Sequence, residues 1–175
     1  MTTDALTIVI HLVSALVAGG VIGLERSFHG RPAGFRTHAL VCLASSLLML
    51  VTVYQDKWIL DIPLETIRTD PTRMAQGIMT GIGFLGAGVI FREGLSVRGL
   101  TTAASIWITA AIGILMGVGF YLPAILATVF TLSILSVFRW IESRLPAHYY
   151  AQHSVRFERD KVMPKSEFDS FLLGY

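Results

Sequence analysis

Three arginines at five-residue intervals, Arg26, Arg31 and Arg36, surround a Pro-Ala-Gly turn, with Glu25 before them and His38 after them. Topology anchoring at lipid phosphates explains Arg26 adequately. A proline and a glycine favour a compact turn, so Arg31 and Arg36 are expected to point in set directions, which a simple anchor does not need. Glu25 at a helix end predicts a buried ion pair with this cluster, and His38 is expected to be hydrogen-bonded packing.

A second polar motif, Asp70-Pro71-Thr72-Arg73, precedes a glycine-rich segment. Aspartate is a favoured N-cap and proline is favoured at the first helical position, so helix capping explains Asp70 better than a functional role does. Arg73 lies where a positive charge opposes the helix dipole, so we expect Asp70 or Glu65 to be its partner. For Arg73 a structural and a functional role stay equally open.

The segments between these motifs are apolar and long enough to cross a bilayer. Apolar residues make up 53% of the chain and charged residues 15%, whereas a soluble domain is typically about a quarter charged. A helix of about 18 residues spans roughly 27 Å, close to the hydrocarbon thickness. We therefore predict an all-α membrane domain over residues 1–145, with five transmembrane helices at about 5–24, 37–54, 74–91, 100–119 and 121–138.

The distribution of arginines predicts the orientation of these helices. The loops expected on one side carry seven arginines, which are Arg26, Arg31, Arg36, Arg92, Arg98, Arg139 and Arg144. By the positive-inside rule that side is cytoplasmic, the amino terminus is outside and the carboxyl terminus is inside. The loop containing Arg98 then joins the first arginine loop in one polar cytoplasmic platform, and Thr101 or Thr102 is expected to cap the helix that follows it.

Small residues recur at four-residue spacing in three of the predicted spans. Such stripes let helix backbones approach closely inside a membrane. Packing within one bundle is the favoured interpretation, and homo-oligomerisation through one stripe stays open. The expected packing glycines are Gly19, Gly23, Gly77, Gly81, Gly83, Gly86, Gly88, Gly113 and Gly117. Three of them match a dinucleotide-binding pattern, but the preceding strand and the later acidic residue that this pattern needs are missing.

The sequence argues against several classes of function. It contains no P-loop, no H-E-x-x-H motif and no nucleophile pattern, so we predict no enzymatic activity, no cofactor and no metal site. All twelve acidic residues lie outside the predicted spans or at their ends, whereas ion-coupled transporters usually place carboxylates near the membrane midplane. The net charge of +2 reflects membrane topology, so no nucleic-acid partner is expected.

Residues 146–175 form a polar tail after the last predicted span. Residues 154–159 alternate as a strand would, and apolar residues between 168 and 172 recur at helical spacing. About thirty residues cannot bury a core of their own. We expect this α/β-like tail to dock on a partner or an inner loop, or to be the start of a further cytoplasmic domain.

Three separated blocks of the chain resemble signature blocks of the MgtC/SapB family of bacterial inner-membrane proteins, in the same order and with similar spacing. The blocks are GLERSFHGRPAGFRTHALVCL, DPTRMAQGIMTGIGFLGAGVIF and VRGLTTAASIWITAAIG. The resemblance implies about five membrane helices, often followed by a cytoplasmic domain of ACT-like fold, of which residues 146–175 would be a truncated start. The family pattern falls on Glu25, Arg26, Gly30, Arg31, Gly34, Arg36, Thr37, His38, Asp70, Pro71, Arg73, Gly81, Gly83, Phe84, Gly86, Gly88, Arg98, Gly99, Thr101 and Thr102.

The resemblance also implies a physiological role. Family members are associated with adaptation to low magnesium and, in some pathogens, with survival inside macrophages, and one restrains the rotary ATP synthase. Our leading hypothesis is a non-enzymatic inner-membrane modulator whose helices lie in the lipid bilayer and dock on another membrane complex of the ATP synthase type. The alternative is a magnesium-coupled or proton-coupled transporter, or an accessory subunit of one.

Overall fold

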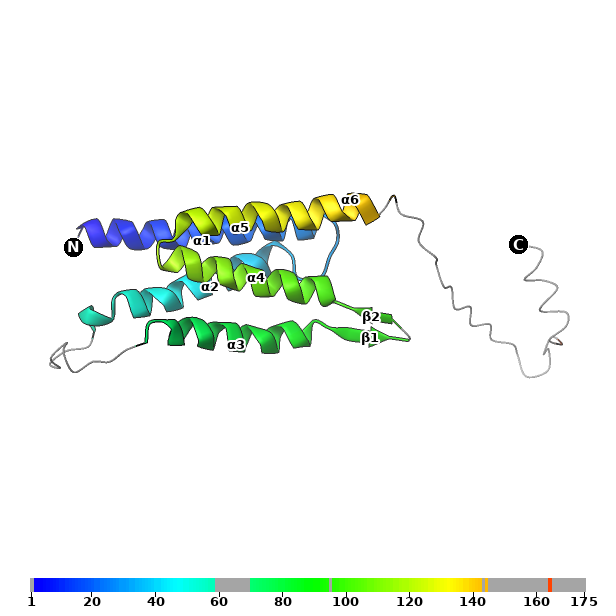
Figure 1. Ribbon diagram of the computed structural model, residues 1–175, viewed down its shortest axis with the longest axis horizontal. Coiled ribbons are helices and arrows are strands. Elements are labelled where there is room, and N and C mark those ends of the chain that lie inside the picture. The colour runs from blue at the N-terminus through cyan, green and yellow to red at the C-terminus, as the bar shows by residue number, and fades with distance from the viewer. Residues whose placement is uncertain (1, 59–69, 95, 143, 145–163, 165–175) are drawn as a thin grey trace. The chain divides into compact units, whose positions relative to one another are not determined.

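Long helices lie side by side in the computed structural model, and each runs opposite to the one before it (Figure 1). Their bounds are α1 (Thr2–Phe28), α2 (Phe35–Val53), α3 (Thr72–Gly88), α4 (Leu100–Gly117) and α5 (Tyr121–Ser133). A short 3-10 turn, Gln55–Lys57, follows α2. A π-helical segment, Ile134–Phe138, joins α5 to the short helix α6 (Arg139–Glu142).

The structure describes residues 2–58, 70–94, 96–142, 144 and 164. All of these helices belong to one unit, Met1–Arg144, and a second unit covers Leu145–Tyr175. The predicted strand and helix of the polar tail, and the predicted start of an ACT-like domain, therefore lie outside the described residues.

Four helical stretches are long and apolar enough to cross a membrane. They are Asp4–Phe28, Phe35–Val53, Leu100–Gly117 and Tyr121–Ile141, with mean hydropathies between 1.6 and 2.3. Large apolar side chains such as Leu6, Leu122 and Phe130 are exposed on these helices. Lipid tails solvate such surfaces, so the chain is a membrane protein. The fifth predicted span, which corresponds to the 17-residue helix α3, stays a prediction, as does the predicted orientation.

A small β-hairpin connects α3 to α4, so the all-α prediction is wrong for this segment. Helix α3 ends at Gly88, and β1 (Phe91–Glu93) pairs antiparallel with β2 (Ser96–Arg98). Two glycines with positive φ angles shape the hairpin: Gly94 at the turn (φ +60°) and Gly99 at its exit (φ +92°). A side chain at Gly99 would also collide with the carbonyl group of Val89. The sequence predicts a loop at residues 92–99.

Helix α1 approaches the backbone of α2 through two glycines. A Cβ atom at Gly19 would lie 2.6 Å from Cβ of Cys42, and one at Gly23 would lie 2.6 Å from Cα of Phe35. Both distances are too short for real carbon atoms, so only glycine allows this approach. The buried side chain of Ile22 lies on the same stretch of α1.

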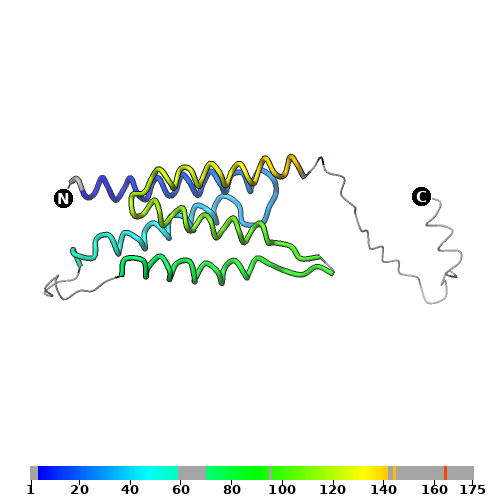
Figure 2. The backbone as a smooth tube through the Cα atoms, viewed as in Figure 1, coloured from blue at the N-terminus to red at the C-terminus, as the bar shows by residue number. Residues whose placement is uncertain are grey.

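Helix α4 approaches another part of α2 in the same way. A Cβ atom at Gly113 would lie 2.8 Å from Cβ of Ser45, and one at Gly117 would lie 2.7 Å from the carbonyl oxygen of Ser46. The backbone of α2 is thus held between glycines of two other helices, and the tube representation shows α2 running between α1 and α3 beside α4 (Figure 2). Helices α1, α2 and α4 form the tightly packed part of the unit.

The glycines of α3 are placed differently. Among the described residues, no atom lies within 4 Å of a Cβ built at the positions that the sequence analysis expected to be packed, Gly77, Gly81, Gly83 and Gly88. Gly86 is the buried residue of α3, with a Cβ position 3.7 Å from Cβ of Ala103 on α4. Helix α3 therefore contacts α4 along one edge and leaves most of its glycine surface exposed.

Matched glycine substitutions test which contacts hold the unit together. We expect Gly113→Ala to destabilise the protein by roughly 1 to 3 kcal/mol, since the new methyl group overpacks the contact between α4 and α2. Gly77→Ala makes the same chemical change where space is open, and alanine favours a helix by about 0.5 to 1 kcal/mol. The measurement is the thermal unfolding midpoint of each purified variant in detergent. Equal midpoints for the two variants would contradict this account of the packing.

Candidate functional site

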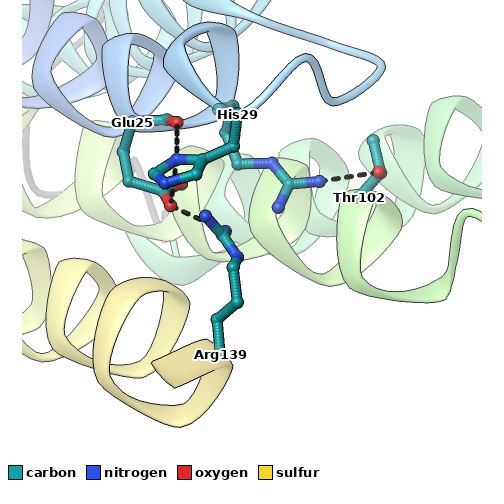
Figure 3. Close-up of polar contacts among 5 residues, drawn as sticks. Glu25, His29, Thr102 and Arg139 are labelled. Atoms are coloured by element: carbon teal, nitrogen blue, oxygen red, sulfur yellow. Dashed lines mark hydrogen bonds and ion pairs between the residues drawn. The ribbon is translucent and has the colours of Figure 1, made fainter. Parts of the chain in front are cut away.

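The carboxylate of Glu25 is the centre of a polar cluster at the end of α1 (Figure 3). Its Oε1 atom lies 2.7 Å from Nη2 of Arg139 and 3.2 Å from Nδ1 of His29. Nδ1 of His29 also lies 2.8 Å from the backbone oxygen of Glu25. The Glu25 side chain is only 8% exposed, so the pair with Arg139 is shielded from solvent and links the end of α1 to α6.

Arg26 connects α1 to the start of α4. Its Nη2 atom donates a hydrogen bond to Oγ1 of Thr102 at 2.9 Å, and the residue is only 2% exposed. The sequence predicts Thr101 or Thr102 as the cap of α4, and this prediction is wrong: the structure places Gly99 at the N-cap, with no side-chain capping bond. The hydroxyl group of Thr102 instead accepts from Arg26. Arg26 is therefore more than a charge anchor, which is the role that the sequence analysis gave it.

His38 connects α2 to the same turn of α4. Its Nδ1 atom lies 3.0 Å from the carbonyl oxygen of Gly34, so this nitrogen carries the proton and donates. Its Nε2 atom lies 3.0 Å from the hydroxyl oxygen of Ser105, which also lies 2.8 Å from the carbonyl oxygen of Thr102. The imidazole is fully buried. The contacts match the role in hydrogen-bonded packing that the sequence predicts for this histidine.

Three buried polar atoms in the cluster have no hydrogen-bond partner within the described part of the chain. They are Oε2 of Glu25, Nε of Arg26 and Nη1 of Arg139. Buried polar atoms are normally satisfied, so each of these marks a place for a further polar contact. Arg26 and Arg139 also line a cavity of about 960 Å³, called the arginine cavity below, together with Arg31 and Arg98.

The other predicted arginines of this end lie around the cluster. Arg31 lines the arginine cavity from the loop between α1 and α2, in which Ala33 adopts a φ of +55°. Arg98 lines it from β2 and pairs with Glu93 at 2.8 Å. Arg36 is exposed on the first turn of α2 and is not among the residues that line the cavity. The sequence predicts both arginines in one cluster, but only Arg31 lines the cavity, and Arg36 lies outside it.

Asp70 and Arg73 lie at the amino-terminal end of α3, which is the end away from the hairpin and the arginine cavity. Oδ1 of Asp70 accepts hydrogen bonds from the hydroxyl group of Thr72 at 2.6 Å and from its backbone N–H at 2.9 Å. These bonds hold the pKa of the Asp70 carboxyl below its ordinary value. The helix start is thus stabilised at neutral pH, and this contribution is lost as the pH falls through the lowered pKa. The backbone N–H of Arg73 donates to the carbonyl oxygen of Asp70 at 3.2 Å, and Glu65 lies outside the described residues.

Sequence reasoning did not identify Arg139, Thr102 and Ser105 as members of the cluster. Arg139 was counted only as a topology charge, because 114 residues separate it from Glu25. Thr102 and Ser105 lie one helical turn apart on a largely apolar helix that also carries the buried Thr109, which is a signal that a search for polar residues inside spans could have used.

Comparison with known proteins gives one family. The model of the MgtC family matches residues 12–144. YhiD of Escherichia coli strain K12, which is named as a candidate magnesium transporter, is 44% identical over 137 residues, which cover 78% of this chain and 63% of that protein. Protein MgtC of Brucella abortus is 42% identical over 73% of this chain and 50% of its own length. Protein MgtC of Salmonella typhimurium is 42% identical over 71% of this chain and 49% of its own length.

The matched region thus spans about half to two thirds of these curated relatives. No solved structure matches the chain.

A double-mutant cycle tests the Glu25–Arg139 pair. We expect Glu25→Gln and Arg139→Gln each to destabilise the protein, because each leaves a shielded charge without its partner, with a coupling energy of about 1 to 3 kcal/mol. The measurement is unfolding in mixed detergent micelles. The control is the same cycle on Glu93 and Arg98, whose side chains are 59% and 65% exposed and for which we expect less than about 1 kcal/mol. Similar couplings for the two pairs would refute the special role of Glu25.

Proposed function

The chain belongs to the MgtC family, as the resemblance of its sequence blocks indicated, and on that premise we propose that it acts in magnesium homeostasis in the bacterial inner membrane. We propose further that it is a non-enzymatic modulator, which docks on another membrane complex of the ATP synthase type. We also propose that the chain crosses the membrane five times, with its amino terminus outside. The end of the bundle that carries the arginine cavity would then be cytoplasmic, and the excess of arginines there supports this orientation.

The observation that carries this proposal is the exposed surface of α3. Its glycines Gly77 and Gly81 line an apolar groove of about 450 Å³ between α3 and α2, together with Leu40, Ser45 and Leu48. Exposed glycines on a membrane helix allow the backbone of another helix to approach closely. No side chain among the described residues covers Gly77 or Gly81. A transmembrane helix of a partner complex can therefore dock along this groove.

The polar groups of the bundle support a modulator for a second reason. Glu25 is engaged by Arg139, Arg26 by Thr102, and His38 by Ser105. Each contact joins two helices, so these groups hold the bundle geometry. Ion-coupled transporters instead need polar groups near the midplane that can exchange their partners during transport.

A magnesium-coupled or proton-coupled transporter is the second candidate, and the naming of the relative YhiD as a candidate magnesium transporter favours it. On that hypothesis, Arg31→Ala or Asp70→Asn abolishes ion flux. On the modulator hypothesis the same changes alter only the activity of the partner. Magnesium uptake and passive proton leak, both measured in vesicles that contain the protein, distinguish the two candidates.

ATP-driven proton pumping in inverted inner-membrane vesicles tests the modulator directly. At matched ATP synthase levels we expect the protein to slow pumping and to leave the passive proton leak unchanged. Gly81→Leu should abolish the effect, because the new side chain fills the groove where the partner helix docks. The rate of acidification, followed with a pH-sensitive dye, is the measurement.

The matched control is Gly83→Leu, which adds the same side chain to another face of α3. Its Cβ position is also open among the described residues, and Gly83 does not line the groove. We expect this variant to slow pumping as the unmodified protein does. Unchanged pumping with the unmodified protein would refute the modulator, and equal losses in both variants would refute the groove as its docking surface.

A further inference from the structure

The charged side chains that line the arginine cavity are all positive, and helix packing does not explain why. Its charged lining residues are Arg26, Arg31, Arg98 and Arg139, and no acidic side chain is among the residues that line it. Two of these cations are balanced from outside the cavity, since Arg139 pairs with Glu25 and Arg98 pairs with Glu93. The cavity therefore selects against cations and attracts anions.

The remaining two arginines supply positive charge that no described carboxylate pairs with. No ion pair joins Arg26 or Arg31 to an acidic side chain within the described residues. Arg26 is 98% buried, and its Nε atom has no hydrogen-bond partner there although its Nη2 atom is satisfied by Thr102. Buried N–H groups are normally satisfied, so this N–H group of a residue that lines the cavity leaves a place for an acceptor, such as a water molecule or an anion.

The amino terminus of α4 opens onto the same cavity. Gly99, Leu100, Thr101 and Thr102 all line it, and Gly99 at the N-cap has no side chain with which to satisfy the first N–H groups of the helix. The first intrahelical bond of this turn runs from the N–H of Ala103 to the carbonyl oxygen of Gly99. The N–H groups of this first turn, for which Gly99 supplies no side-chain acceptor, and the helix dipole add further attraction for an anion.

We infer that the arginine cavity binds a phosphate group. The guanidinium groups of Arg26 and Arg31, which pair with no carboxylate among the described residues, match the two negative charges of a phosphate monoester, and the flat fork of a guanidinium group matches its oxygen atoms. Free helical N–H groups are common ligands for the same anion. The inference is independent of the proposed function, because it holds for a modulator and for a transporter alike.

The apolar part of the cavity lining indicates that the phosphate group belongs to a larger molecule. Apolar side chains that line the cavity include Phe91, Val97, Ile134, Leu135 and Phe138. A volume of about 960 Å³ lies at the upper end of the range for small-molecule sites and is far more than inorganic phosphate fills. The phosphate can come from an anionic phospholipid headgroup or from a soluble phosphate compound, and both sources share the chemistry that the arginines recognise.

Calorimetric titration of the full chain tests the inference. The protein is purified in phosphatidylcholine nanodiscs and titrated with inorganic phosphate, with chloride at equal ionic strength as the reference. In the lipid arm, dioctanoyl phosphatidic acid is compared in detergent with dioctanoylglycerol, which has the same chains and no phosphate. Saturable binding of either phosphate-containing probe at one site per chain supports the inference, and the arm that responds identifies the source.

Two arginine variants decide whether the cavity is the site. Arg31→Gln removes an exposed cation that lines the cavity, and we expect it to weaken binding at least tenfold. Arg36→Gln removes an equally exposed arginine five residues further on that does not line the cavity, and binding should change less than twofold. Arg98→Gln provides a second cavity variant that leaves the buried cluster intact. Equal losses in the Arg31 and Arg36 variants, or binding of neither phosphate probe, would overturn the inference.

Discussion

The close approach of α1 and α4 to the backbone of α2 is the contact on which the rest of the structure depends. Lipid removes most of the hydrophobic drive for helix association, so helices in a membrane gain from dispersion contacts between closely spaced backbones. Four glycines allow that spacing here: Gly19 and Gly23 on α1, and Gly113 and Gly117 on α4. Because α2 is shared by both contacts, its position fixes α1 relative to α4.

The polar cluster at the arginine end follows from this packing. Arg26 reaches Thr102, and His38 reaches Ser105, only because α1, α2 and α4 come this close together. These hydrogen bonds in turn fix the rotation of each helix about its axis, which small residues alone specify weakly. The glycine contacts therefore supply the proximity, and the polar contacts supply the register.

Sequence reasoning predicted the membrane class and the family. It also predicted a buried ion pair for Glu25, but with the arginines of the first loop, whereas the structure pairs Glu25 with Arg139. Helix positions follow from apolar length, which is a local property of the chain, and the glycine spacing on α1 and α4 is equally local. Sequence reasoning could not reveal that the similar glycine stripe on α3 is left open, because contact with a neighbour depends on how the helices are arranged. The hairpin at residues 91–98 was missed because each of its strands is only three residues long.

The π-helical segment Ile134–Phe138 connects the packing of the bundle to the chemistry of its arginine end. A π turn inserts one residue, which rotates all later side chains by about 100° relative to a continuous α-helix. Arg139 follows this segment directly, so the insertion helps to set the direction in which its guanidinium group reaches Glu25. The same segment contributes Ile134, Leu135 and Phe138 to the arginine cavity. A regular α-helix here would turn Arg139 to another face of the helix, so this irregular turn is part of the site.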